Sequence, residues 1–272
     1  MHPALLLLAD SRLPAGGHAH SGGVEAAVAA GAVLDVATLA AFLRGRLHTT
    51  GAVCAALAAA ACALPTAPSS PVPTSPDVLT SSGRVWEELD AEADARTASP
   101  AQRRAARQQG RLLLRVAGRL WPSPVLESLA AAVPSPHHPV ALGAAAHAAG
   151  AAPEDAALAA AYHAITGPAT AAVRLLGLDP VAVHRLLADL TPNLTTVTAR
   201  AAEAAARELQ APVGGQAAVR VGERAVRQGP PEDVGGADPD LRTWAGLPAY
   251  SAPALDLLAE RHAEAAVRLF VS

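Results

Sequence analysis

Two histidines separated by one residue, His18 and His20, are the first candidates for metal chemistry in the sequence. In a loop, two imidazoles at this spacing can both reach one divalent ion, and imidazole suits nickel and zinc. A firm site needs three or four ligands, and no third ligand stands nearby at a recognised spacing. The sequence therefore favours a structural or interface role for the pair and predicts no resident metal. Transient contact with nickel and a permanent nickel site stay open as alternatives.

Catalysis by a nucleophile is not supported by the residues around Ser21. The nucleophile elbow of serine hydrolases needs Gly-x-Ser-x-Gly after a strand, whereas Ala19 stands at the first position and no strand is expected before it. All 21 basic residues are arginine, so the chain has neither a P-loop lysine nor a Schiff-base lysine. We therefore predict that the protein is not an enzyme.

A second histidine pair, His137 and His138, lies between two prolines. Adjacent side chains in an extended segment point in opposite directions, which is poor geometry for chelation. We expect one of these histidines to be buried and the other exposed. Cys54 and Cys62 are eight residues apart on a predicted helix, so their Cα atoms would lie about 12 Å apart, too far for a disulfide.

The first histidine pair belongs to a turn, residues 10–25, that departs from the alanine-rich composition of the chain. Pro14 fixes one φ angle, and Gly16 and Gly17 permit a positive φ or a close approach of the backbone. Ser21 is expected to cap the following helix, with Glu25 in its first turn. The pattern predicts a shaped turn, not a flexible tether.

The order Leu-Pro-x-Gly-Gly-x-x-x-Ser-x-Gly-Val-Glu over residues 13–25 resembles the N-terminal signature of the UreF family of urease accessory proteins. His18 is a departure, because many members carry an aromatic residue there. Three further parts of the chain resemble the centre, second half and C-terminus of the family. These parts are residues 94–99 with 110–113, 136–140 with 174–176, and 255–262 with 268–272.

The resemblance implies a homodimeric protein without catalysis of its own. It would bridge the accessory protein UreD (also called UreH) and the nickel-carrying GTPase UreG, regulate the GTPase, and help to deliver nickel to apo-urease. The complex, not a bound cofactor, would handle the nickel transiently. Partner contacts are expected in the turn and in the final helix, at Pro14, Gly16, Gly17, His18, His20, Ser21, Glu25, Asp256, Arg261, His262 and Arg268. A direct nickel metallochaperone that uses His18 and His20 is the alternative.

Composition points to a helical protein in the cytoplasm. Half of the 272 residues are hydrophobic but only 3% are aromatic, and alanine, the best helix former, lets helices approach closely. A net charge of -3 gives no strong attraction to nucleic acid or to an anionic membrane. The longest strongly apolar run, residues 52–64, is shorter than the roughly 20 residues that cross a bilayer. We expect neither a membrane span nor a signal peptide.

The pattern predicts an all-α fold, a single globular helical bundle of about eight to ten helices in one domain over residues 1–272. Two loop or disordered insertions are expected at about 65–83 and 211–250, where proline, glycine and polar residues gather. The expected helices cover residues 3–9, 21–30, 36–62, 100–120, 140–149, 154–166, 168–176, 180–190 and 193–210, with a last one from Pro253.

Two helix surfaces carry further hypotheses. Six arginines follow one side of the helix that begins at Pro100, namely Arg103, Arg104, Arg107, Arg111, Arg115 and Arg119. They are either solvated and partly paired with the acidic segment 85–95, or a docking face for an acidic partner. On the final helix, an apolar stripe is expected at Leu255, Leu258, His262, Ala265 and Leu269. Burial of Leu269 and Phe270, within the protein or against a partner, is expected as well.

Overall fold

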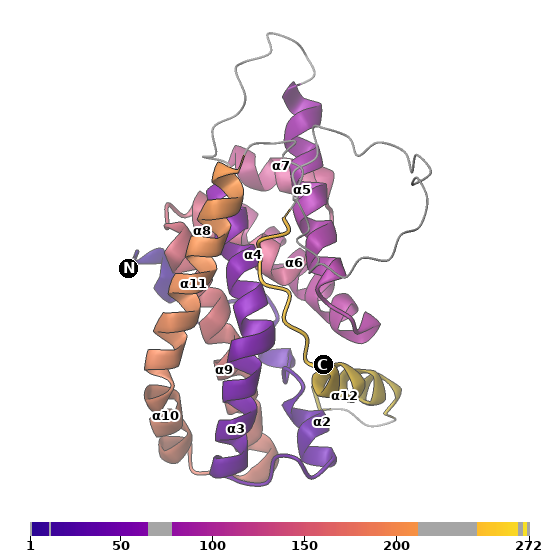
Figure 1. Ribbon diagram of the computed structural model, residues 1–272, viewed down its shortest axis with the longest axis vertical. Coiled ribbons are helices and arrows are strands. Elements are labelled where there is room, and N and C mark those ends of the chain that lie inside the picture. The colour runs from indigo at the N-terminus through magenta and orange to yellow at the C-terminus, as the bar shows by residue number, and fades with distance from the viewer. Residues whose placement is uncertain (1, 11, 65–77, 212–243, 266–268, 271–272) are drawn as a thin grey trace, which may run out of the picture.

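The computed structural model describes residues 2–10, 12–64, 78–211, 244–265 and 269–270, and no β-strand occurs among them (Figure 1). The predicted all-α class is therefore confirmed. The α-helices are α1 (Ala4–Leu8), α2 (Val24–Ala29), α3 (Val36–Arg46), α4 (Ala52–Ala63), α5 (Val78–Ala95), α6 (Pro100–Leu120), α7 (Pro124–Ala132), α8 (His138–Ala148), α9 (Pro153–Leu176), α10 (Pro180–Asp189), α11 (Thr191–Gln210) and α12 (Pro253–Glu264). A 3-10 turn, η1 (Gly17–Ala19), precedes α2, and a π-helical turn, η2 (Leu47–Gly51), joins α3 to α4.

Helix α4 lies at the centre of the bundle, where α8, α9 and α11 pack against it (Figure 1). Eight of its twelve residues are alanine, and ten of the twelve are buried. Small side chains let the helix backbones come close together. The closest approach is at Gly143 of α8, where an added Cβ would lie 2.2 Å from the Ala58 carbonyl oxygen. The core thus depends on backbone proximity more than on large side chains.

Helices α3 and α4 run on through η2 as one helix over residues 36–63, which is long and apolar enough to cross a membrane by length and composition alone. Two thirds of its most apolar window, 67%, is buried inside the protein. That burial is what the core helix of a bundle shows. Its apolar character is therefore accounted for by packing against the neighbouring helices.

Three predicted helix starts are confirmed by their caps. The Asp35 carboxylate accepts a hydrogen bond from the Thr38 amide at 2.8 Å, and the Thr38 hydroxyl accepts one from the Asp35 amide at 3.0 Å. Ser99 accepts from the Gln102 amide at the start of α6. At the start of α10, Asp179 accepts from two amides. These side chains satisfy donors that a helix N-terminus leaves without partners.

The predicted break at Gly167 is wrong, because α9 continues as one helix with Pro168 inside it. Proline has no amide hydrogen, so the carbonyl one turn earlier, at Ala164, loses its helical partner. The Nε of Arg46 donates to that carbonyl at 3.0 Å. A tertiary contact thus supplies the hydrogen bond that the proline cannot make. The helix α7 was not predicted at all; Ser123 caps it and Pro124 takes its first position.

Both predicted insertions fall mainly outside the described residues, at 65–77 and 212–243. Their boundaries need correction. Helix α5 already begins at Val78, and the side chains of Trp244 and Leu247 are buried in the core. Arg96 holds this second segment, because its guanidinium donates to the carbonyls of Trp244 at 2.6 Å and Pro248 at 3.2 Å. The single-domain interpretation stays a prediction.

Candidate functional site

A cavity of about 660 Å³ lies where the two ends of the chain meet the bundle. Its walls come from the glycine-rich turn, from α4 and α9, and from the segment that leads into α12. Of the predicted site residues, Gly17, His20 and Asp256 line this cavity. The structure therefore brings together two motifs that lie far apart in the sequence.

The turn has a defined shape, as predicted, and three of its glycines have a positive φ. Gly16 has a φ of +78° and immediately precedes η1. Gly22 has a φ of +59°, and an added Cβ there would lie 2.7 Å from the Pro168 ring. Gly17 has neither a positive φ nor a close neighbour, and Pro14 is exposed.

Ser21 is not the cap that the sequence predicted. Helix α2 begins at Val24, after Gly23 with a φ of +87°. The side chain of Ser21 is fully buried, and its hydroxyl finds no hydrogen-bond partner among the described residues. Burial on this scale is also the wrong setting for a nucleophile that must reach a substrate.

Four histidines line the cavity: His20 from the turn, His137 just before α8, His138 in α8 and His163 in α9. The rings of His138 and His163 have centroids 5.9 Å apart. Burial, together with the nearby His163 and His20, lowers the pKa of His138 to about 3. Burial also lowers the pKa of His163 to about 4, against a hydrogen bond to the Leu8 backbone. Both imidazoles are therefore neutral at pH 7.

The prediction of one buried and one exposed histidine at 137–138 is half wrong. His137 is buried, but His138 is only half-exposed and lines the cavity. The other predicted pair cannot be compared in full. The backbone of His18 lies in η1, whereas its side chain lies outside the described part of the chain.

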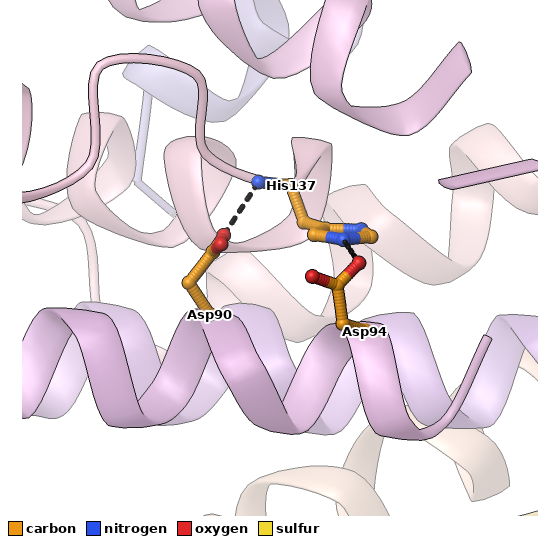
Figure 2. A group of neighbouring side chains, drawn as sticks. All are labelled: Asp90, Asp94 and His137. Atoms are coloured by element: carbon orange, nitrogen blue, oxygen red, sulfur yellow. Dashed lines mark hydrogen bonds and ion pairs between the residues drawn. The ribbon is translucent and has the colours of Figure 1, made fainter. Parts of the chain in front are cut away.

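A polar cluster holds His137 in place, and Figure 2 shows it above one face of α5. The His137 amide donates to Asp90 at 2.7 Å, and its ring Nε2 lies 2.7 Å from the Asp94 carboxylate. Arg107 of α6 forms ion pairs with both carboxylates, at 2.9 Å to Asp90. The cluster joins α5, α6 and the start of α8, and so positions His138 in the cavity wall.

Asp90, Asp94 and His137 are also the only group in the described part of the chain whose ligand atoms lie close enough for a shared metal ion. Burial acts to raise the pKa of Asp94, but hydrogen bonds from His137 and Arg107 hold it below its ordinary value. Burial lowers the pKa of His137, which the two carboxylates oppose. With Arg107 already on both carboxylates, the group is suited to joining helices. A metal would have to displace that arginine.

A second polar cluster closes the C-terminal end of the chain onto α2. The Glu25 carboxylate accepts hydrogen bonds from the amides of Leu269 at 2.8 Å and Phe270 at 3.0 Å. The Nε2 of His262, buried in α12, lies 3.3 Å from the same carboxylate and 3.1 Å from the Phe270 carbonyl. We call these residues the C-terminal clasp. Helices α2 and α12 pack against each other (Figure 1).

Helix α12 is fixed at its other side by α6. The Glu260 carboxylate accepts hydrogen bonds from the Ser99 hydroxyl and from the Ala101 amide, the latter at 2.9 Å. Burial raises the pKa of Asp256, although a hydrogen bond from the Ser99 backbone opposes this. Arg261 is exposed, and Arg268 lies outside the described residues.

The predicted apolar stripe on the last helix is only partly present. Helix α12 ends at Glu264, and Ala265 is already extended. Leu269 is 74% exposed, which contradicts the part of the prediction that buried it within the protein. Phe270 is half-buried against the core and lines the cavity. Beyond the helix, Glu25 accepts the amides of Leu269 and Phe270.

The arginine-rich side of α6 serves two purposes. Arg107 pairs with the acidic helix α5, as the simpler interpretation predicted, and Arg103 donates to the Thr97 carbonyl. The remaining four are exposed and form no ion pair with another described residue: Arg104, Arg111, Arg115 and Arg119. Docking of an acidic partner on these four stays a prediction.

Comparison with known proteins places these features in one family. The model of the family described as UreF matches residues 33–191. A urease accessory protein UreF from Mycolicibacterium vanbaalenii is 47% identical over 201 residues, which cover 73% of this chain and 85% of the relative. The UreF of Mycobacterium tuberculosis is 38% identical over 268 residues, with 98% and 97% covered. The second relative therefore spans both the glycine-rich turn and α12.

Proposed function

The chain belongs to the UreF family of urease accessory proteins, and from this premise we propose that it acts as a non-catalytic scaffold in nickel insertion. In this role it bridges UreD (UreH) and the GTPase UreG, and it modulates the nucleotide cycle of the GTPase while apo-urease receives nickel. The protein works as a homodimer in the cytoplasm. The observation that carries the proposal is the meeting of the glycine-rich turn with α12 at the C-terminal clasp.

The clasp supports a binding role because apolar side chains on the helix and tail that it holds are exposed to water. Leu269 is 74% exposed and Leu257 of α12 is 66% exposed. Exposed apolar side chains on a well-held element are typical of a surface that a partner covers. Asp256, Arg261, His262 and Arg268 hold this helix or meet UreD. Pro14, Gly16, Gly17, Ser21 and Glu25 shape the turn beside it.

Nickel is the cargo in this proposal, and the protein is not its resident site. Neutral imidazole is the form that binds nickel, and His20 and His138 are close enough for the charge of one to affect the pKa of the other. His18 and His20 give a passing ion transient contacts.

Co-purification tests the scaffold role with a substitution that spares the core. Leu257→Ser replaces an exposed side chain on α12, and we expect it to weaken capture of UreD and UreG and to reduce urease activation in a host that lacks its own copy. Val181→Ser on α10, which is 75% exposed, is the matched control. Removal of the last twelve residues should abolish activation. If the truncated chain still yields fully active urease, or if the intact chain captures neither protein, the proposal is wrong.

A direct nickel metallochaperone using His18 and His20 is the alternative, favoured only by the position of His20 in the cavity wall. Equilibrium dialysis of the isolated protein separates the two functions. A scaffold binds nickel no more tightly than micromolar, whereas a metallochaperone binds it tightly and in a fixed ratio. Loss of tight binding in a His18→Ala, His20→Ala variant would confirm the alternative.

A further inference from the structure

One positively charged side chain in the cavity wall has no role in the proposed function. Arg46, the last residue of α3, lines the cavity at the start of η2. Its Nε donates to the Ala164 carbonyl at 3.0 Å. Within the described ranges this is its only hydrogen bond, and it forms no ion pair there. The two terminal nitrogens of the guanidinium therefore have donors to spare inside a half-buried site.

The position of this guanidinium is determined by its surroundings. Pro168 frees the Ala164 carbonyl that holds Nε, and Gly22 packs against the other side. A Cβ on Gly22 would lie 3.3 Å from both the Cζ and the Nε of Arg46. A π-helical turn, a feature common at functional sites, begins at the next residue. These contacts hold the side chain in place, and no acidic residue in the described part of the chain pairs with it.

The charges that face the cavity leave it positive. Arg12 is paired with Asp10, and Arg96 is paired with Glu92. Two more arginines, Arg46 and Arg174, line the cavity without an ion pair among the described residues. Among the described lining residues, the only carboxyl outside these ion pairs is that of Asp256, whose burial raises its pKa. The site is therefore unsuited to retaining a bare dication beyond a transient contact, and a bound anion is favoured.

The rest of the cavity wall suits the uncharged part of an organic molecule. Leu57, Leu142 and Phe270 supply apolar surface, and His138 and His163 supply neutral polar groups. A volume of about 660 Å³ lies within the range of small-molecule sites, roughly 300–1,000 Å³. An inorganic ion would leave most of that space unfilled.

We propose that this cavity binds a small organic anion whose carboxylate or phosphate group takes the free donors of Arg46. The planar guanidinium matches either group through two parallel hydrogen bonds. The apolar wall covers the body of the ligand. This site goes beyond the scaffold role and does not depend on it, since the isolated chain carries every residue required.

Isothermal titration of the purified full-length protein tests the proposal at constant ionic strength. Benzoate is the probe, and its neutral analogue benzamide shows whether charge is needed. Phenyl phosphate tests the phosphate form of the same chemistry. We expect benzoate or phenyl phosphate to bind the wild-type protein at least tenfold more tightly than benzamide. This first comparison needs no variant, so it stands even if a substitution disturbs folding.

Arg46→Gln should weaken binding of the anionic probe by about ten- to a hundredfold, the loss expected for hydrogen bonds to a charged group. Arg44→Gln is the matched control, because Arg44 is exposed two residues earlier on α3. The proposal is overturned if both anions fail to bind, if benzamide binds equally well, or if Arg46→Gln binds like the control. Binding of inorganic phosphate alone would also overturn it, since no organic body would then be recognised.

Discussion

The Nε2 atom of His262 lies 3.3 Å from the Glu25 carboxylate, although the two residues come from opposite ends of the chain. Sequence patterns marked both as site residues, in two separate motifs. The structure shows that they belong to one clasp. Glu25 also accepts the amides of Leu269 and Phe270, so one carboxylate organises α2, α12 and the end of the chain.

Removing the charge of Glu25 should loosen the clasp. Glu25→Gln replaces one charged acceptor of two backbone amides with a neutral group, and such hydrogen bonds contribute about 1.5–3 kcal/mol each. We expect amide exchange at Leu269 and Phe270 to become about tenfold faster, as measured by NMR, which corresponds to about 1.4 kcal/mol. Glu264→Gln, at an exposed position at the end of α12, should leave both rates unchanged. Equal rates in the two variants would mean that Glu25 does not hold the tail.

The cluster around Arg107 should be important for stability. Asp90→Asn removes the buried ion pair to Arg107 and leaves that guanidinium with less compensation. We expect the free energy of unfolding to fall by about 2 kcal/mol or more in urea denaturation. Glu87→Gln on the exposed side of α5 is the control and should change it by less than about 0.5 kcal/mol. If Asp90→Asn left the free energy of unfolding unchanged, the cluster would not be important for stability.

Acid should destabilise the protein through the cavity histidines. Burial lowers the pKa of His138 to about 3 and of His163 to about 4, whereas an unfolded histidine has a pKa of 6.5. The unfolded chain therefore binds protons below pH 6.5 that the folded protein does not bind. The stability that the neutral rings contribute is complete above pH 6.5 and is lost as the pH falls toward 4.

We expect the Tm to fall across this window, and to fall less steeply in a His138→Gln, His163→Gln double variant. Differential scanning calorimetry at several pH values measures both slopes. His184→Gln, at an exposed histidine on α10, is the control and should keep the wild-type slope. A double variant with the wild-type slope would mean that these rings titrate normally.

Helix contact at Gly143 gives a test of the alanine-rich core. An added Cβ in Gly143→Ala would lie 2.2 Å from the Ala58 carbonyl, so α4 and α8 must separate. We expect a loss of about 1–3 kcal/mol in thermal or urea unfolding. Gly118→Ala in α6 has no atom near the new methyl group and should stabilise by up to about 1 kcal/mol. The opposite signs distinguish crowding from helix propensity.

The helical architecture could be predicted because its signals are local. Asp35, Ser99 and Asp179 cap helices by contacts within three residues, and alanine-rich runs have little alternative to helix. The errors arose where distant residues decide. Pro168 sits inside a helix only because Arg46 takes the carbonyl it frees. Ser21 failed as a cap because two positive-φ glycines move the start of α2 beyond it.

The candidate site could be predicted only at its two ends. Glu25 and His262 came from motifs in the turn and in the last helix. The cavity wall between them was missed, because Arg46, His138 and His163 lie on three different helices and share no sequence pattern. Asp90 and Asp94 carried a weak signal, four residues apart on one helix face, which is ordinary spacing for surface charges. Only the fold shows that Arg107 and His137 meet them.

Glu25 also sets a condition on anything that would displace the chain's last residues. Its carboxylate is only 13% exposed and accepts two amide hydrogen bonds from the tail. If the tail is displaced, the Glu25 carboxylate keeps His262 beside it but loses both amide donors. A partner surface made of hydrocarbon alone would leave the buried carboxylate without those hydrogen-bond donors. A partner that displaces the tail must therefore supply N–H donors to the Glu25 carboxylate. This requirement makes an otherwise apolar contact selective.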